Sequence, residues 1–284
     1  MEHDIPFAME LKNIAGWNQT EQDWHGYLSF DREGCFLAEF DGERAGTMTT
    51  IRYGNRIGWI GMVLVHPVFR GKGIATALLQ LGIRYLQGSG VRCIKLDATA
   101  MGKKVYVPLG FQEEYAVSRH EKRIAPSSGR SKTSSGLWQD GRVEPLTVQQ
   151  LSGIAAYDEL IFGANRRSVL AQLSKRDERY SFYAHNARGI TGYIMAHQGY
   201  EAVQIGPWAA SDAQTAEALL AALLSKLDGG RVFLDLPCPN AEGMQMMEKH
   251  GFRIQRDFSR MYLGDNEFPG TPSMIYGSSG AEKG

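Results

Sequence analysis

The segment Val63–Leu79 constrains the fold of this 284-residue chain most strongly. A run of apolar residues stops at His66-Pro67, the glycine-rich loop Arg70–Gly73 follows, and apolar residues then recur at helical spacing. This order predicts a buried strand, a tight turn and a helix, which together are a common unit of mixed α/β domains.

The loop Arg70–Gly73 combines features that suit a bound anion. At the start of a helix, free backbone N–H groups and the positive end of the helix dipole point at the same place. Gly71 and Gly73 remove side chains from that place, and Arg70 and Lys72 add cationic donors. The loop matches neither the P-loop pattern nor the dinucleotide fingerprint, so we expect a phosphate or pyrophosphate carried by another kind of ligand.

The rest of the first half continues the α/β pattern. The predicted elements are, in order, a hairpin at 35–40 and 44–51, a strand buried on both faces at 59–65, a helix at 74–87 and a strand at 92–98. A strand, a helix and a second strand at this spacing predict a parallel pair with a crossover helix. We therefore expect a mixed α/β domain, with a central sheet flanked by helices.

A break in composition separates this region from the rest of the chain. Residues 125–141 lack apolar periodicity and are rich in serine and glycine, which predicts a linker. The alternative is a long surface loop inside one domain, although such loops are uncommon in compact domains. The length of the chain also favours two domains, which we expect at 1–124 and 142–284.

The second half repeats the order of the first. Its predicted elements are a hairpin at 182–185 and 189–196, a strand at 202–208, a helix at 213–227 and a strand at 231–236. Two short matches support the repeat: Ile94–Asp97 resembles Val232–Asp235, and Gly110-Phe111 resembles Gly251-Phe252. The two halves have the pattern of a diverged tandem duplication.

Composition excludes several classes of protein. Lysine plus arginine and aspartate plus glutamate each total 31, so no net charge favours nucleic acid or an acidic membrane. The three cysteines are far apart, which disfavours a disulfide scaffold and a zinc site, and we expect no metal. We see no signal peptide and no apolar run long enough to span a membrane, so we expect a cytoplasmic protein.

At the loop, the sequence resembles the GNAT superfamily of N-acetyltransferases. The family's cofactor loop, R/Q-x-x-G-x-G/A, is matched by Arg70–Ala75, and the V-x-P before it by Val65–Pro67. The terminal Leu109–Phe111 also follows the family's order. The alternative for the loop is a tight turn that carries surface cations and binds nothing.

The resemblance implies a coenzyme A thioester, acetyl-CoA above all, as co-substrate. Its pyrophosphate would lie on the loop, and its pantetheine arm would pair with the preceding strand as an extra strand does. The cofactor-binding residues that the resemblance implies are Met62, Val63, Val65, Arg70, Gly71, Lys72, Gly73, Ile74, Ala75 and Thr76.

Tyr106 is the predicted catalytic residue. Acyl transfer to an amine needs a donor that protonates the departing thiolate, and in GNAT enzymes a tyrosine shortly before the terminal L-G-F often serves. The alternative is a tyrosine packed under the cofactor. Where the family often has an asparagine after the preceding strand, this chain departs from the pattern, and Thr99 is the only similar polar residue.

No general base stands out in the sequence. Glu39, His66, a residue of the second half and a chain of waters all stay open, and His66 also fits a solvated loop residue. Trp17 and Trp24 lie where GNAT enzymes place acceptor-binding helices, with core aromatics as the alternative.

The second half lacks the features that mark the first. Its strand-to-helix junction, Ile205–Ala213, has no arginine, lysine or paired glycines, and Asp212 would repel a phosphate. Four residues before the glycine of each Gly-Phe pair stand Tyr106 in the first half and Met247 in the second. We infer that only the first half binds coenzyme A, which leaves the second for acceptor recognition, dimerisation or lid formation.

Asp158 and Arg166 are the candidate acceptor contacts of the second half. They lie in a Phe-Gly-Ala-Asn-Arg region, 157–167, that resembles a segment of bacterial two-domain GNAT proteins. Asp158 would bind an ammonium group and Arg166 a carboxylate. The alternative is the end of one helix followed by a capped second helix with ordinary surface charges.

Together these observations predict an acyl-CoA-dependent N-acyltransferase, with acetyl as the transferred group and direct attack of an amine on the thioester. The acceptor classes left open are small amines, amino acids and the termini of proteins. Two other classes also stay open: a non-catalytic coenzyme A sensor or interaction protein, and a purely structural α/β protein.

Overall fold

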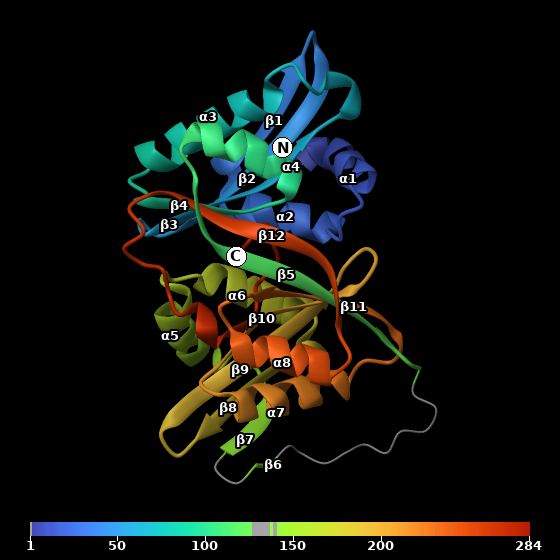
Figure 1. Cartoon of the computed structure of the whole chain (residues 1–284), viewed down its shortest axis with the longest axis vertical. Coiled ribbons are helices and arrows are strands. Elements are labelled where there is room, and N and C mark those ends of the chain that lie inside the picture. Colours follow the sequence, from blue (N-terminus) through green and yellow to red (C-terminus); the bar gives the residue numbers. More distant parts are fainter. Residues whose placement is uncertain (1, 127–136, 139–140) are drawn as a thin grey trace. The chain divides into compact units, whose positions relative to one another are not determined.

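The computed structural model describes residues 2–126, 137–138 and 141–284, and the chain divides into two compact units (Figure 1). Unit 1 comprises Met1–Glu114, Ser259–Phe268 and Ala281–Gly284. Unit 2 comprises Tyr115–Phe258 and Pro269–Gly280. Most of the expected linker, 127–136 and 139–140, lies outside the described residues.

Unit 1 is built on a mixed sheet with the strand order β1-β2-β3-β4-β12. Its strands are β1 (Cys35–Phe40), β2 (Glu43–Tyr53), β3 (Ile57–Val65), β4 (Cys93–Ala98) and the second half of β12 (Arg253–Gly264). Its helices are α1 (Ile5–Ile14), α2 (Glu21–Phe30), α3 (Ile74–Gly88) and α4 (Ala100–Tyr106), with short 3-10 helices at Glu2–Asp4, Arg32–Gly34, Pro67–Phe69 and Val107–Leu109.

Unit 2 repeats this plan with the strand order β5-β11-β10-β9-β8-β7-β6, and β13 pairs with β10. Its strands are β5 (Gln112–Ile124), β6 (Leu137–Trp138), β7 (Gly141–Pro145), β8 (Ser181–Asn186), β9 (Gly189–Gln198), β10 (Val203–Ala210), β11 (Gly230–Pro237) and β13 (Ile275–Gly277). Its helices are α5 (Leu151–Phe162), α6 (Arg167–Arg176), α7 (Ala213–Leu224) and α8 (Ala241–Lys249), with 3-10 helices at Glu178–Tyr180 and Pro272–Met274.

The predicted mixed α/β fold, a mixed sheet flanked by helices, is confirmed, and several element bounds are corrected. Residues 137–138, assigned to the linker from the sequence, form β6, which pairs with β7. The helix predicted over 213–227 ends at Leu224, and Ser225 caps it. Only the family resemblance indicates helices where α1 and α2 lie, since their apolar residues repeat less regularly than those of α3.

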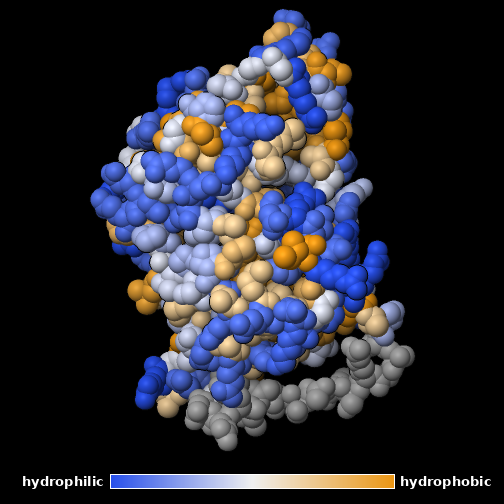
Figure 2. Space-filling view, in the orientation of Figure 1, coloured by the Kyte–Doolittle hydropathy of each residue, from blue (hydrophilic) through white to orange (hydrophobic). Residues whose placement is uncertain are grey.

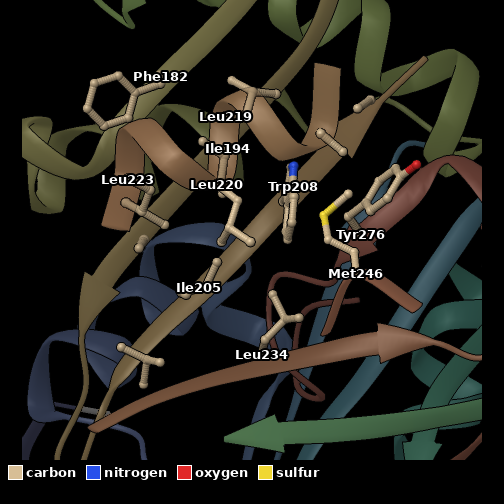
Figure 3. Close-up of a cluster of buried hydrophobic side chains, with 14 of the residues drawn as sticks. Phe182, Ile194, Ile205, Trp208, Leu219, Leu220, Leu223, Leu234, Met246 and Tyr276 are labelled. Atoms are coloured by element: carbon tan, nitrogen blue, oxygen red, sulfur yellow. The ribbon is translucent and has the colours of Figure 1, made fainter. Parts of the chain in front are cut away.

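Each unit buries its own hydrophobic core. In unit 1, α3 packs on one face of the sheet, where Leu86 contacts the backbone of Gly58 and Met48 contacts Gly82. In unit 2, Trp208 and Tyr276 lie side by side with Leu219 and Leu220 of α7 over the sheet (Figure 3). The helical spacing seen in the sequence is therefore the core face of α3 and α7.

The halves of the sequence exchange their last strands. Strand β5 of the first half pairs with β11 in unit 2, and the second half of β12 pairs with β4 in unit 1. The units consequently differ from the ranges 1–124 and 142–284 expected from the sequence: 115–124 packs in unit 2, whereas 259–268 and 281–284 pack in unit 1.

Two buried ion pairs mark the exchange. Arg260 binds Asp97 in unit 1 through two hydrogen bonds of 2.8 and 2.9 Å, and Arg119 binds Asp235 in unit 2 through two of 2.6 and 2.8 Å. In both pairs the partners lie directly opposite each other on neighbouring strands. Each arginine follows the phenylalanine of its Gly-Phe pair by eight residues (119 − 111 and 260 − 252). The two pairs are thus equivalent in the repeat, and each joins an arginine of one half to an aspartate of the other.

The face of the molecule drawn in Figure 2 is mainly polar. On the face drawn in Figure 2, hydrophilic residues predominate and apolar residues lie in small scattered groups. Among the described residues, no helix is both long and apolar enough to cross a membrane.

Candidate functional site

The predicted loop connects β3 to α3 in unit 1. Gly71 and Gly73 have φ values of +76° and +80°, in the left-handed region that favours glycine. A Cβ at either position would meet no atom within 4 Å, so open space lies beside both residues. Gly73 directly precedes α3 and has no side chain to cap it, which leaves the first N–H groups of the helix available to an anion.

The two cations of the loop are exposed. The Arg70 Nε donates a hydrogen bond of 3.3 Å to the carbonyl of Val65. The Lys72 ammonium lies 4.2 Å from the centre of the Phe40 ring and 5.6 Å from that of Phe69. Ile74 is buried in the core, whereas Ala75 and Thr76 are half-buried in the first turn of α3.

Strand β3 leaves one edge open beside the loop. Its parallel pairing with β4 covers only Ile57–Trp59, while its antiparallel pairing with β2 continues to Val65. Among the described residues, no strand pairs with the β4-side edge of β3 from residue 60 to residue 65. Met62, Val63 and Val65 lie on this stretch, so an extended ligand has backbone groups to pair with.

A bulge distorts β3 at the same place. Met62 has φ +51°, which is unusual for a residue other than glycine, and the register with β2 shifts between Thr47 and Thr49. The Thr47 hydroxyl donates a hydrogen bond of 3.1 Å to the Met62 carbonyl, which holds the distorted peptide in place. Strained backbone of this kind is common at functional sites.

Tyr106 ends α4 and packs against the core of unit 1. Its ring lies 5.9 Å from that of Phe111, and burial raises the pKa of its hydroxyl to about 12. Within the described part of the chain, no group is hydrogen-bonded to this hydroxyl. Thr99, the polar residue before α4, caps that helix by accepting a hydrogen bond of 3.1 Å from the Gly102 N–H.

The other predicted candidates of unit 1 are dispersed. Glu39 is exposed on β1, and the half-buried His66 has its Nε2 3.7 Å from the Glu10 carboxylate. Trp24 is buried in α2 and Trp17 is half-buried in the loop before it. The geometry therefore singles out neither Glu39 nor His66 as the general base.

Unit 2 differs from unit 1 at the start of the corresponding helix and at the edge of the corresponding strand. Asp212 caps α7, and its carboxylate accepts a hydrogen bond of 2.7 Å from the Thr215 N–H. Burial acts to raise the pKa of Asp212, but hydrogen bonds from Thr215 and Ser211 outweigh it and lower the pKa. A pocket of about 530 Å³ opens beside these residues, yet the carboxylate already supplies the negative charge that the helix start attracts.

The open edge seen on β3 is filled in unit 2. Strand β10 pairs with β11 only over Val203–Ile205, and its register with β9 shifts between Ile205 and Trp208. Beyond that shift, β13 pairs with Trp208 and Ala209, and the Ser278 N–H donates to the Asp235 carbonyl of β11. Strand β13 therefore occupies the position beside β10 that corresponds to the free edge of β3 in unit 1. Apart from a short apolar run at 275–277, no sequence pattern indicated β13.

Asp158 and Arg166, the predicted acceptor contacts, bind each other inside unit 2. Two hydrogen bonds of 2.7 and 2.8 Å join them, and both side chains are almost fully buried. Arg166 also donates to Ser279 at 2.8 Å, and Tyr193 donates to Asp158. Of the alternative interpretation, only the order of the helices holds: α5 ends at Gly163, which has φ +96°, and α6 follows without a side-chain cap at Arg166.

Comparison with protein families decides the relationship. A model of the acetyltransferase (GNAT) family matches residues 6–111, and a second model, described as an acetyltransferase (GNAT) domain, matches residues 154–277. The chain belongs to the GNAT superfamily. The tandem arrangement of two GNAT domains and the assignment to the acyltransferases, both predicted from the loop and the repeat, are thereby confirmed.

Individual relatives of this GNAT chain are acyltransferases by name. It is 22% identical to holothin acyltransferase from Pseudoalteromonas sp. over 253 residues, which cover 87% of this chain and 81% of that protein. It is 37% identical to mycothiol acetyltransferase from Streptomyces coelicolor, but over only 29% of this chain and 28% of that protein. A Pyrococcus horikoshii structure assigned as an acetyltransferase has the same fold, with a TM-score of 0.80, 20% identity, and coverage of 100% of this chain and 94% of that one.

Proposed function

We propose that unit 1 transfers the acetyl group of acetyl-CoA to an amine. The observation that carries the proposal is the free edge of β3 at residues 60–65 beside the uncapped start of α3. Backbone N–H groups at the helix start suit a pyrophosphate, and a free strand edge suits the amide groups of a pantetheine arm. Gly71 and Gly73 leave open space beside the loop, so the residues present fit the co-substrate.

In the proposed reaction, bound acetyl-CoA supplies a thioester whose carbonyl carbon accepts the amine. The acceptor reacts as the free amine, its nitrogen forms the new C–N bond and loses a proton to water, and the C–S bond breaks. Tyr106 donates its hydroxyl proton to the departing thiolate and regains one from solvent. The raised pKa of Tyr106 supports this role, because the hydroxyl holds its proton at neutral pH.

The cofactor loop can be tested without knowledge of the acceptor. Acetyl-CoA should raise the melting temperature of the intact chain, and Arg70→Ala or Gly73→Glu should abolish the increase, since the first removes a cation and the second places a carboxylate in the anion's space. Lys175→Ala, which removes an exposed cation from α6, is the matched control and should leave the shift intact. An unchanged shift in both loop variants would exclude this loop as the cofactor site.

Turnover separates the enzyme from a coenzyme A sensor. Release of the thiol should be measured with a panel of small amines, amino acids and peptides, and Tyr106→Phe should lower kcat by about 10²-fold. Turnover unaffected by Tyr106→Phe would remove the tyrosine from the mechanism. Binding of acetyl-CoA without turnover for any acceptor would favour the sensor.

A further inference from the structure

Residues 281–284 are inserted into unit 1, although they follow the last strand of unit 2. Their sequence is Ala-Glu-Lys-Gly. Glu282 is 6% exposed and Lys283 is 2% exposed, values that are unusual for charged side chains unless they are paired. A buried lysine next to the sheet of an acyltransferase that acts on amines requires an account of what holds it.

Aromatic side chains of unit 1 bind the backbone of this segment. The Trp59 Nε1–H donates a hydrogen bond of 3.0 Å to the Ala281 carbonyl, and the Tyr53 hydroxyl donates one of 2.6 Å to the Lys283 carbonyl. Gly61 lets the chain come close, because a Cβ there would lie 2.8 Å from the Glu282 carbonyl oxygen. The slot thus binds a peptide turn, residues 281–283, through two of its carbonyl groups.

Two residues of the α1–α2 region bind the side chains of the segment. The Gln19 amide donates a hydrogen bond of 2.8 Å to the Glu282 carboxylate, and the Lys283 ammonium lies 3.4 Å from Asp23 Oδ1. The other oxygen of Asp23 is held by Thr20, whose N–H and hydroxyl donate at 2.8 and 2.9 Å. The capping box of α2 therefore fixes the Asp23 carboxylate independently of Lys283.

The Trp59 donor is also held by groups outside the segment. The Arg260 guanidinium lies 4.7 Å from the centre of the Trp59 ring, and Asp97 holds that guanidinium. Trp59 and Asp23 are therefore held in part by residues outside 281–284.

The slot lies beside the bulge of β3. Because Gly58 faces α3, the alternation of a strand turns Trp59 and Gly61 to the opposite face of the sheet, where the segment lies. Gly61 directly precedes Met62, and Thr49 is its partner on β2. The Thr49 hydroxyl is buried and lacks a hydrogen-bond partner within the described residues. The slot therefore retains an unused polar group next to the free stretch of β3.

We propose that residues 281–284 occupy, as an intramolecular competitor, the slot in which unit 1 binds its acceptor, and that this acceptor is a peptide with a basic side chain. The proposal rests on the proposed function, since it assigns the acceptor side of the same site. Asp23 binds the cationic group, Tyr53 and Trp59 bind the backbone carbonyls, and an acceptor must displace the segment to reach β3.

The chemistry of the contact favours a replaceable occupant. Burial of an ammonium group is unfavourable unless a close partner compensates for it, and the contact from Lys283 to Asp23 is long for an ion pair that must do so. Its other carboxylate partner is the neighbouring Glu282 of the segment itself. Attachment of the segment to the chain compensates for the unfavourable burial of the Lys283 ammonium, because it gives the segment an effective concentration on the order of millimolar.

The test measures peptide binding to the full chain in the absence of any acyl-CoA. The probe is a fluorescently labelled peptide with the sequence of residues 278–284, Ser-Ser-Gly-Ala-Glu-Lys-Gly. Glu282→Ala with Lys283→Ala removes both side-chain anchors of the competitor, so the Kd of the peptide should fall by about tenfold or more relative to the unchanged chain. Lys283→Met alone keeps the backbone hydrogen bonds and should give a smaller gain of about threefold.

Two controls assign the site. Lys175→Ala should bind the peptide as weakly as the unchanged chain, and Asp23→Asn in the double variant should abolish the gain. Equal affinity for the double variant and the unchanged chain, or no binding to either alanine or methionine variant, would overturn the proposal. Circular dichroism reports that each variant is folded, and peptide binding is measured without acyl-CoA or turnover, so failure here and failure of the proposed acyl transfer are told apart.

Discussion

At the scale of single residues, the protonation of Tyr106 governs the proposed reaction. Burial raises the pKa of its hydroxyl to about 12, above the ordinary value of about 10. The group is therefore protonated throughout the range in which an amine acceptor loses its proton. We expect kcat/KM to rise with pH as the amine deprotonates and then to stay level, without a fall near pH 10. A pH profile with a descending limb of apparent pKa near 10, lost in Tyr106→Phe, would contradict this assignment.

The cysteines give a second prediction at this scale. Burial raises the pKa of the Cys35 thiol to about 12, with a contribution from Asp31, and burial raises that of the Cys93 thiol to about 11. Because the thiolate is the reactive form, both should react very slowly with an aromatic disulfide reagent at pH 8 and fully after denaturation. Labelling of the native chain followed by mass spectrometry checks this. Fast modification of either residue in the native chain would be the opposite outcome.

At the scale of elements, the two buried ion pairs fix the exchanged strands. Asp97→Asn leaves the Arg260 guanidinium buried without its charge partner, so we expect a loss of about 3 kcal/mol in the free energy of unfolding. Asp235→Asn should act similarly through Arg119 in unit 2. Replacing both partners by apolar residues, Asp97→Leu with Arg260→Met, should restore most of the stability.

Denaturant unfolding monitored by tryptophan fluorescence measures these losses, with Glu248→Gln on the exposed side of α8 as the control. A loss from Asp97→Asn no larger than that of the control would mean that the pair does not hold β12 in place.

The elements also show how far sequence reasoning extends. The helix at α3 and the strand at β3 were predictable, because apolar spacing over many residues reports which face is buried. Gly71 and Gly73, the glycines of the loop with positive φ, were identified from the same segment of the sequence. The exchange of β5 and β12 was not predictable, because a strand's pattern shows that it pairs but not with which partner. The segment 281–284 escaped notice for a related reason, since nothing in Ala-Glu-Lys-Gly indicates burial.

The same limit applies to Asp158 and Arg166. A carboxylate and a guanidinium near each other in sequence suggested ligands for an acceptor, whereas the structure pairs them with each other in the interior of unit 2. Charge alone did not distinguish the two cases, because a buried pair and a binding pair use the same residue types.

At the scale of the whole molecule, neither half of the sequence contains a complete unit. The chain crosses from one unit to the other after residues 114, 258, 268 and 280. A fragment of residues 1–126 therefore lacks the strand that covers the edge of β4, together with the segment 281–284. A fragment of residues 141–284 lacks β5, which pairs with β11 along most of its length.

This division predicts that neither fragment folds in the absence of the other. Alone, each should remain unfolded or aggregate, because an uncovered apolar strand edge invites non-native pairing. Mixed during refolding, 1–126 and 141–284 should recover native circular dichroism and the acetyl-CoA thermal shift, since the cut falls where no β5 or β12 pairing is lost. Cooperative unfolding and an acetyl-CoA shift in the isolated fragment 1–126 would contradict the prediction, because the first half would then complete its sheet without the exchanged strand.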